Sequence, residues 1–170
     1  MNEPVRIRDA TPADLAAMLA IYNHAVAHTT ASYDYTPRSM ERQQAWFAGK
    51  QEGKLPVLVA QCGDEVAGFA SYGPFRAWEG YRFTVEHSVY VDEAFRRRGI
   101  ASALVQELLE RAQAAGLHLM VAGIDAANTG SIELHRRLGF EDAGVLREAG
   151  YKFERWLDLA FMTRKIAPVT

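Results

Sequence analysis

One stretch of the chain joins an extended run to a helix: Tyr90-Val91-Asp92-Glu93-Ala94-Phe95-Arg96-Arg97-Arg98-Gly99-Ile100-Ala101. The helix predicted from Ile100 to Ala115 has an apolar stripe on one face, and Gly116 supplies its stop. A helix start presents unpaired backbone N–H groups and the positive end of the helix dipole, and small residues there admit a ligand close to the backbone. The three arginines add charge-assisted hydrogen bonds. This turn predicts a phosphate-binding site, and a solvated basic turn is the alternative.

On both sides of this stretch, the hydrophobic pattern alternates between strand and helix periodicity. The predicted helices are 11–26, 39–51, 100–115 and 128–138, with Thr11 as the N-cap of the first. The predicted strands are 5–9, 56–61, 66–72, 81–91, 118–124, 144–147 and 155–163. Residues 148–150 are expected to form the turn between the last two strands. The order β-α-α-β-β-β-α-β-α-β-β predicts an α/β fold with a mixed sheet and helices on both faces.

The composition is ordinary for a soluble globular protein, with 49% hydrophobic residues, 24% charged residues and a formal net charge of −2. A length of 170 residues fits a single domain, 1–170. There is no excess of Lys and Arg, so nucleic-acid binding is not expected, and no apolar stretch approaches the roughly 20 residues of a membrane span. The amino-terminal residues lack a signal-peptide pattern, and the single Cys62 fits a reducing compartment. We therefore expect a cytoplasmic protein.

No metal site is expected from the five histidines. Only His24 and His28 have the i,i+4 spacing of a helical zinc motif, and the glutamate of HExxH is missing between them.

A second motif follows the basic turn: Asn128-Thr129-Gly130-Ser131-Ile132-Glu133-Leu134-His135-Arg136-Arg137-Leu138-Gly139-Phe140. On a helix, positions 128, 131 and 135 fall on one face, because seven residues complete two turns to within roughly 20°. The predicted helix can therefore pack through its leucines and still present a polar stripe to a ligand.

The basic turn reads R-x-x-G-x-A and resembles the acyl-CoA-binding motif Q/R-x-x-G-x-G/A of GNAT acetyltransferases. The resemblance implies a GNAT fold, with a central, mostly antiparallel twisted sheet of about seven strands flanked by about four helices. It also implies acetyl-CoA as co-substrate. The implied pyrophosphate loop is Arg97, Arg98, Gly99, Ile100, Ala101 and Ser102, the implied pantetheine-binding strand edge is Val89, Tyr90 and Val91, and the implied cofactor contacts on the next helix are Asn128 and Ser131.

Over nearly its whole length the chain resembles one GNAT branch, the phosphinothricin and methionine sulfoximine acetyltransferases. Residues 21–30, 76–91 and 150–158 carry this resemblance. It implies acetylation of the α-amino group of a small amino-acid-like substrate, and the tail segment implies a homodimer. The substrate contacts that it implies are Arg76, Ala77, Trp78, Arg82, Glu86, His87 and Ser88.

Strand alternation places Glu86 on a polar face with Arg82, Thr84 and Ser88. Attack of an amine on a thioester needs a base, a donor to the carbonyl oxygen and an acid for the leaving sulfur. We assign Glu86 as the base, directly or through water, and a backbone N–H of residues 89–91 as the donor. In most of the superfamily a tyrosine at the position of His135 protonates the thiolate; here His135 is the thiolate acid or an assisting base. The alternatives are an exposed strand glutamate and a surface histidine.

Two other functions fit the motifs. The first is a GNAT enzyme with another acceptor, such as a protein amino terminus, an aminoglycoside or a polyamine; Arg76 and Arg82 disfavour the cationic acceptors. The second is an acyl-CoA-binding module without catalysis, against which Glu86 and His135 argue.

Overall fold

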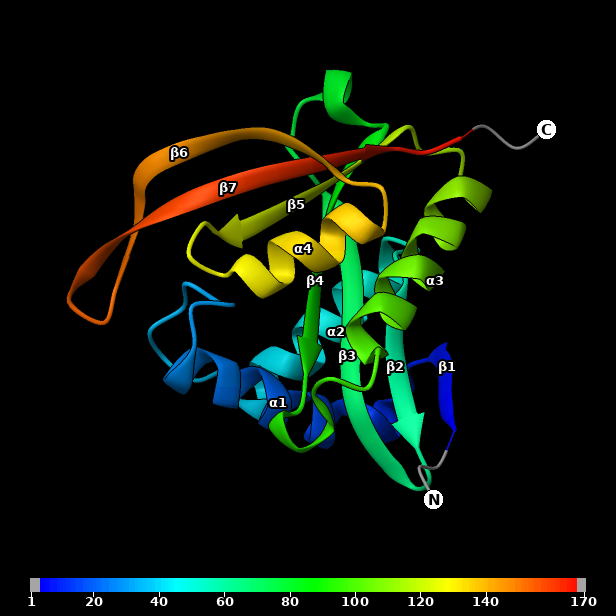
Figure 1. The fold of residues 1–170 in the computed structure, drawn as a ribbon. Helices are drawn as coiled ribbons and strands as arrows, with labels where there is room; N and C mark the ends of the chain where they lie inside the picture. Colours follow the sequence, from blue (N-terminus) through cyan, green and yellow to red (C-terminus); the bar gives the residue numbers. More distant parts are fainter. Residues whose placement is uncertain (1–3, 168–170) are drawn as a thin grey trace.

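The computed structural model describes residues 4–167, which form one seven-stranded sheet in the order β1-β2-β3-β4-β5-β7-β6 (Figure 1). β4 and β5 run parallel and the other neighbouring pairs are antiparallel, so the sheet is mixed. The strands are β1 (Val5–Asp9), β2 (Val57–Cys62), β3 (Glu65–Pro74), β4 (Thr84–Val91), β5 (Leu119–Asp125), β6 (Glu141–Lys152) and β7 (Arg155–Lys165).

Two of the α-helices begin at a side chain that accepts a hydrogen bond from the first turn, and the other two follow short 3₁₀ turns. They are α1 (Leu15–His28), α2 (Met40–Glu52), α3 (Ile100–Ala114) and α4 (Thr129–Arg137). Ser39 accepts a hydrogen bond from the backbone N–H of Arg42 at the start of α2, and Asn128 accepts one from Ser131 at the start of α4. Gly116, with φ of +71°, follows α3. The element order predicted from sequence is confirmed.

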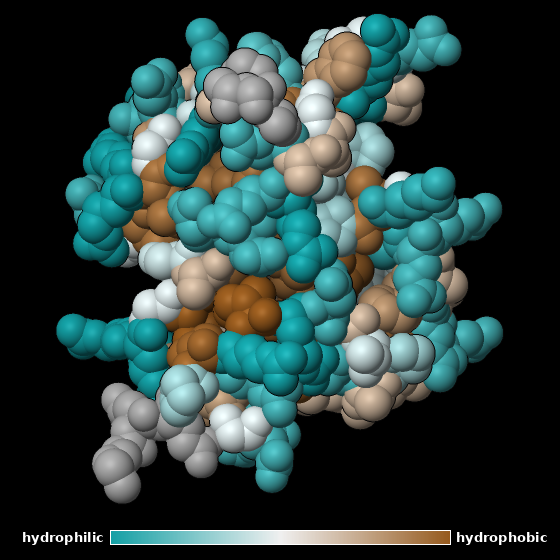
Figure 2. All heavy atoms as spheres, turned by 90° about the vertical axis from the view of Figure 1, so that its right-hand side faces the viewer, coloured by the Kyte–Doolittle hydropathy of each residue, from teal (hydrophilic) through white to brown (hydrophobic). Residues whose placement is uncertain are grey.

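The helices cover both faces of the sheet. Successive residues of β2 point to opposite sides: Leu58 and Ala60 pack with the apolar stripe of α3, whereas Val57 and Val59 pack with α1 and α2. Seen from the right-hand side of Figure 1, the surface is mostly polar, with apolar side chains in the hollows between charged ones (Figure 2). No helix in residues 4–167 is long and apolar enough to cross a membrane.

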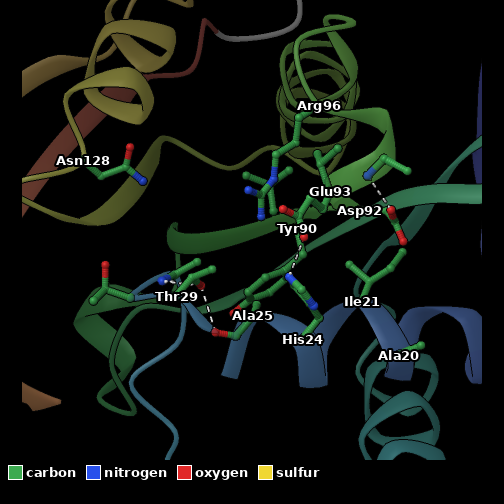
Figure 3. A pocket seen from close by; sticks show the side chains of 15 residues that line it. Ala20, Ile21, His24, Ala25, Thr29, Tyr90, Asp92, Glu93, Arg96 and Asn128 are labelled. Atoms are coloured by element: carbon green, nitrogen blue, oxygen red, sulfur yellow. Dashed lines mark hydrogen bonds and ion pairs between the residues drawn. The ribbon is translucent and has the colours of Figure 1, made fainter. Parts of the chain in front are cut away.

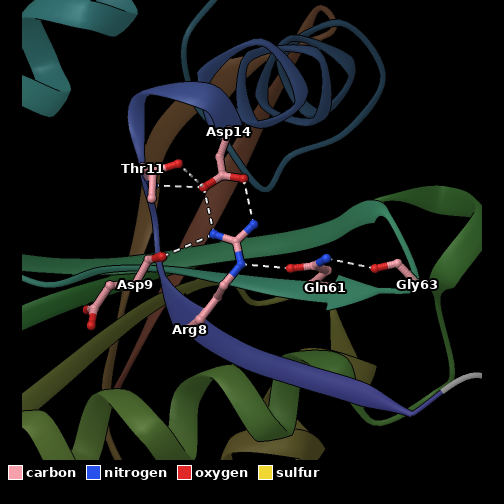
Figure 4. A network of polar contacts seen from close by, with 6 residues as sticks. All are labelled: Arg8, Asp9, Thr11, Asp14, Gln61 and Gly63. Carbon is pink, nitrogen blue, oxygen red and sulfur yellow. Dashed lines mark hydrogen bonds and ion pairs between the residues drawn. The ribbon is translucent and has the colours of Figure 1, made fainter.

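A network of polar contacts anchors β1 to the short 3₁₀ turn Pro12–Asp14 that leads into α1 (Figure 4). Both terminal nitrogens of Arg8 donate to the carboxylate of Asp14 at 2.8 Å, and its Nε donates to Gln61 at 2.7 Å. The paired guanidinium lowers the pKa of Asp14. Asp14 also accepts from the backbone N–H of Thr11 at 2.7 Å. Thr11 therefore caps the 3₁₀ turn, and α1 begins later than predicted, at Leu15 with Asp14 as its N-cap.

The prediction that one strand covers 81–91 is wrong at its start. Glu79–Tyr81 form a 3₁₀ turn, in which the backbone N–H groups of Tyr81 and Arg82 donate to Trp78 and Glu79. These bonds satisfy amides that a strand would pair with a neighbour. Arg82 therefore does not share the face of β4 that carries Glu86.

The prediction of a turn at residues 148–150 is also wrong. These residues lie within β6, where the register against β7 shifts between Leu146 and Gly150. Glu148 has φ of +53° and its backbone N–H donates to Asp158 at 2.8 Å, which fits a bulge rather than a chain reversal. The reversal is at Phe153 and Glu154, both with positive φ.

Candidate active site

β4 and β5 separate at the middle of the sheet. In the described residues they pair only from Thr84 to Glu86 and from Leu119 to Val121. Beyond Glu86, β4 continues with β3 and β5 continues with β7, so a gap opens between the two parallel strands. A cavity of about 340 Å³ lies at this gap, and its walls are formed by β4, β5, α4 and the loop after α1.

One further cavity adjoins this one, and a third adjoins the second, with which it shares Val91 and Arg96. A cavity of about 820 Å³ shares Val89, Tyr90 and Asn128 with it and extends toward α1. In Figure 3, His24 of α1 points toward Glu93, and the Nε2 of His24 lies 3.2 Å from the Oε2 of Glu93. The third cavity, about 380 Å³, lies at the start of α3 and is lined by Val91, Phe95, Arg96, Arg97, Gly99, Ile100, Ala101, Ser102, Leu134 and Arg137.

The start of α3 suits an anionic ligand. Gly99 has φ of +76°, a conformation that favours glycine, and, apart from its two chain neighbours, nothing in residues 4–167 lies within 4 Å of where its Cβ would be. The open space there borders the first amides of α3 and the side chains of Arg96 and Arg97. A cavity with basic walls therefore lies where the sequence predicts the phosphate-binding site.

Glu86 lies at the point where the strands separate, on the wall of the 340 Å³ cavity. Burial raises the pKa of its carboxyl group, and the positive charge of Arg76 partly offsets this effect. A Cβ at Gly123 of β5 would lie 3.0 Å from the Oε1 of Glu86. Because Gly123 has no side chain, the carboxylate of Glu86 has room in its present position.

His87 and His135 form a buried pair between β4 and α4. Their Nε2 atoms are 3.0 Å apart, and the Nδ1 of His135 is 2.7 Å from the carbonyl oxygen of Ser131. Burial and, secondarily, the neighbouring His135 lower the pKa of His87 to about 3; burial also lowers the pKa of His135. With 2% of its surface exposed, His135 is not a surface histidine.

The loop between α1 and α2, residues 29–39, forms one wall of the 340 Å³ cavity and is held from β5 and β6. Thr30 donates to the carboxylate of Asp125 at 2.6 Å. The buried Nζ of Lys152 donates to the carbonyl oxygens of Thr29 at 2.9 Å and Ser32 at 2.5 Å.

The ring of Tyr33 in the same loop lies against Gly150, where a Cβ would collide with it. The loop therefore depends on the β6 bulge, a dependence that the local sequence does not reveal.

The three cavities bring together most of the residues selected from sequence: Glu86, His87, Ser88, Val89, Tyr90, Val91, Arg97, Gly99, Ile100, Ala101, Ser102, Asn128, Ser131 and His135. Arg98 does not line them; its guanidinium lies 5.1 Å from the ring centre of Phe95.

The remaining selected residues, Arg76, Ala77, Trp78 and Arg82, line a separate cavity of about 540 Å³ at the start of β4. Arg76 still acts on Glu86 through its charge. Sequence reasoning missed Gly123, Asp125 and Lys152. The position of Asp125 at the end of a predicted strand was an available signal, whereas nothing local marked the other two.

Residues 18–140 match the sequence model of one protein family, which is described as the acetyltransferase (GNAT) family. The chain belongs to the GNAT acetyltransferase family. This GNAT enzyme uses acetyl-CoA, and its separated parallel strands and basic helix start lie within the matched region.

Relatives of this GNAT chain are similar over nearly their whole length. An L-methionine sulfoximine/L-methionine sulfone acetyltransferase of Pseudomonas paraeruginosa is 52% identical over 95% of both chains. A phosphinothricin N-acetyltransferase of Streptomyces viridochromogenes is 39% identical over 96% of this chain and 88% of the relative.

Two solved structures have the same fold as this GNAT chain. An N-acetyltransferase from Staphylococcus aureus has a TM-score of 0.96 and 47% identity, with 97% of this chain and 100% of that chain covered. A phosphinothricin acetyltransferase from Sinorhizobium meliloti in complex with AcCoA has a TM-score of 0.93 and 39% identity, with 96% and 89% covered.

The residues of this GNAT chain fit acetyl-CoA. The positive φ of Gly99 and the open space beside it suit a pyrophosphate, which Arg97 and the first amides of α3 would hold. The edge of β4 after Glu86, which lacks a β5 partner among the described residues, would pair with the pantetheine amides. Acetyl-CoA supplies the acetyl thioester. Within residues 4–167, no group of three or more His, Cys, Asp or Glu side chains is arranged to hold a metal ion.

Proposed function

We propose that this single-domain enzyme acetylates the α-amino group of a small amino-acid-like substrate such as methionine sulfoximine, methionine sulfone or phosphinothricin. One observation carries the proposal: a half-buried carboxyl group, Glu86, lines a cavity of about 340 Å³ at the point where β4 and β5 separate. That volume suits a small acceptor better than an aminoglycoside or a folded protein. The names of relatives at 52% and 39% identity point to the same substrates.

Glu86 acts as the general base in this proposal. An amino acid arrives with its amine protonated, and only the unprotonated amine attacks a thioester. Burial raises the pKa of the Glu86 carboxyl group toward neutral pH, which makes its carboxylate a better proton acceptor than an exposed glutamate. The proton passes to Glu86 directly or through a water molecule.

A backbone N–H of residues 89–91 donates to the thioester oxygen as negative charge develops there. Such a donor is fixed by the pairing of β4 with β3, where Val89 and Tyr90 lie opposite Ala70 and Phe69. It therefore needs no rearrangement during the reaction. Asn128 and Ser131, which line the same cavity from α4, contact the pantetheine arm.

The acceptor is held through its polar groups. Ser88 and His87 line the cavity beside Glu86, and Arg76 is close enough to lower the Glu86 pKa. A guanidinium suits a carboxylate, phosphinate or sulfone oxygen. Arg82, Ala77 and Trp78, in the separate 540 Å³ cavity, complete the proposed acceptor-binding set.

The proposed assembly is a homodimer formed through β6 and β7. The exposed apolar side chains of these strands and of the turn between them support it: Val145, Leu146, Tyr151, Phe153 and Trp156. A cluster of this kind is more often covered by a partner than left in water. The proposed location is the cytoplasm, because a single buried free thiol, Cys62, suits a reducing compartment.

A thiol-release assay with acetyl-CoA tests the function. The acceptors are L-methionine sulfoximine, L-methionine sulfone, phosphinothricin, common amino acids, an aminoglycoside and a peptide. We expect turnover of the first three to exceed that of the aminoglycoside and the peptide by at least about tenfold in kcat/KM. Preferential turnover of the aminoglycoside or peptide would assign another acceptor class. Binding of coenzyme A without turnover of any amine would assign a non-catalytic module.

A further inference from the structure

The two imidazole rings of His87 and His135 are joined in one plane. The ring centres are 5.1 Å apart and the planes differ by 13°, while the Nε2 atoms are 3.0 Å apart. Two stacked rings with these centres would not bring one nitrogen from each so close. The contact is therefore an in-plane hydrogen bond between the two nitrogens.

The partners of the pair fix its protons. A carbonyl oxygen only accepts, so the Nδ1 of His135 carries the proton that is donated to Ser131 at 2.7 Å. In neutral His135 the Nε2 is then an acceptor, and the Nε2 of His87 must be the donor. The remaining nitrogen, Nδ1 of His87, is left with a lone pair and has no hydrogen-bond partner in the described part of the chain.

The surroundings favour the neutral His87–His135 pair over one in which His135 carries a positive charge. If His135 carried both protons, His87 would accept at Nε2 and its Nδ1 would become a buried N–H without an acceptor in residues 4–167. Both rings pack against Phe140, whose ring centre lies 5.8 Å from that of His87 and 5.1 Å from that of His135. An apolar neighbour offers no compensation for a positive charge.

We propose that His87 is a positioning residue that donates to His135, holds it in the Nδ1–H tautomer, and thereby leaves His135 without a proton to give to the departing thiolate. This inference rests on the proposed function, since it assigns roles within the same site. It replaces the role of His87 as a substrate contact, and it makes His135 the link that fixes α4, with Ser131, against β4.

The proton that the thiolate needs then comes from the amino group of the acceptor. The ammonium group loses one proton to Glu86, and the C–N bond forms as the C–S bond breaks. The thiolate takes the second proton of the attacking nitrogen, and the proton on Glu86 returns to water. No step requires a proton from His135.

The matched variants are His135→Gln and His135→Leu. A glutamine amide keeps an N–H for Ser131 and an oxygen for His87, but it cannot protonate a thiolate. We expect kcat for His135→Gln to stay within about tenfold of wild type and His135→Leu to lose more. A loss of roughly 100-fold or more in His135→Gln, with acetyl-CoA affinity retained in calorimetry, matches the usual contribution of a general acid and would overturn the proposal.

A second pair, His87→Gln and His87→Phe, tests the donor. Glutamine keeps an N–H for the Nε2 of His135, and phenylalanine does not. We expect kcat to fall by about tenfold in His87→Phe and to be largely restored in His87→Gln, with KM for acetyl-CoA unchanged in both. Equal loss in both variants would contradict a donor role.

Nitrogen NMR of the ring atoms decides the tautomer without reference to turnover. In wild-type protein uniformly labelled with ¹³C and ¹⁵N at neutral pH, we expect His135, assigned by through-bond correlation of its ring with its own backbone, to be neutral with the proton on Nδ1. His87 is expected to carry its proton on Nε2. Finding His135 protonated at Nε2 would overturn the proposal even if the variants fail to fold. Absence of turnover in wild type with these tautomers present would reject the proposed function alone.

Discussion

At the scale of single residues, the chemistry depends on the environment of Glu86. Its carboxyl group is half-buried beside Gly123, and its pKa is raised by burial and lowered by the charge of Arg76. The two effects oppose each other, so each can be changed separately.

Removing the charge of Arg76 is expected to shift the pH profile of kcat/KM, on its acidic side, to higher pH. A base works only when unprotonated, so kcat/KM falls as the pH decreases through the pKa of Glu86. In Arg76→Ala the offset is lost, the pKa rises further and this acidic limb of the profile shifts to higher pH. The matched control is Arg82→Ala, for which the limb stays in place. A limb that does not move in Arg76→Ala would argue that Glu86 is not the titrating base.

Adding one methyl group beside Glu86 is expected to reduce turnover. In Gly123→Ala the new Cβ lies 3.0 Å from the present position of Oε1, so the carboxylate must shift. A displaced base loses alignment, and we expect kcat to fall by about tenfold. Gly49→Ala in α2, where nothing in the described chain lies within 4 Å of the new Cβ, is the control. Full activity of Gly123→Ala would show that the carboxylate does not work from this position.

Only some of the residues of the candidate site could be predicted from the sequence. The basic turn was found because helix-start chemistry is a local signal, and Glu86 was found through the family resemblance, with which strand alternation agreed. The contact between His87 and His135 joins positions 48 apart in the chain, and alternation alone placed His87 simply on the opposite face from Glu86. The pairing follows from how α4 packs on β4, which no local pattern specifies.

At the scale of elements, the loop at residues 29–39 is shaped by β6. Lys152 binds two of its carbonyl oxygens, the backbone carbonyl of Tyr151 accepts from the hydroxyl of Tyr35, and Gly150 receives the ring of Tyr33. Three consecutive residues of one strand thus hold a wall of the acceptor cavity. The sequence predicted a turn here because bulges also favour glycine and positive φ, and the two are distinguished only by the partner strand.

Replacing Lys152 by methionine is expected to loosen this wall. The side chain stays apolar and of similar length, but two hydrogen bonds from a charged group are lost, at a cost of about 1.5–3 kcal/mol each in stability. Hydrogen exchange should rise in residues 29–36 and KM for the acceptor should increase, with KM for acetyl-CoA little changed. Lys165→Met, at an exposed position, is the control. Unchanged exchange in Lys152→Met would contradict the role of β6.

At the scale of the whole molecule, the exposed apolar side chains of β6 and β7 decide the proposed assembly. Trp156 is 63% exposed and packs on Tyr151 of the same chain, with ring centres 4.9 Å apart. A charge placed there is costly when a partner covers the site and harmless when water does.

Sedimentation analysis is expected to show a dimer for the wild type and a monomer for Trp156→Glu. The exposed charge leaves the sheet of one chain intact, so the variant should remain folded by circular dichroism. Arg147→Ala, at another exposed position of β6, changes the net charge by the same −1 and serves as the comparison with a smaller effect. A wild-type protein that sediments as a monomer would reject the homodimer.

The most direct test of the account compares wild type and Glu86→Gln with L-methionine sulfoximine and acetyl-CoA, following thiol release beside calorimetric binding of acetyl-CoA. We predict that Glu86→Gln binds acetyl-CoA as wild type does and loses roughly 100-fold or more in kcat. Undiminished turnover in Glu86→Gln, with the same acetyl-CoA affinity, would contradict the account.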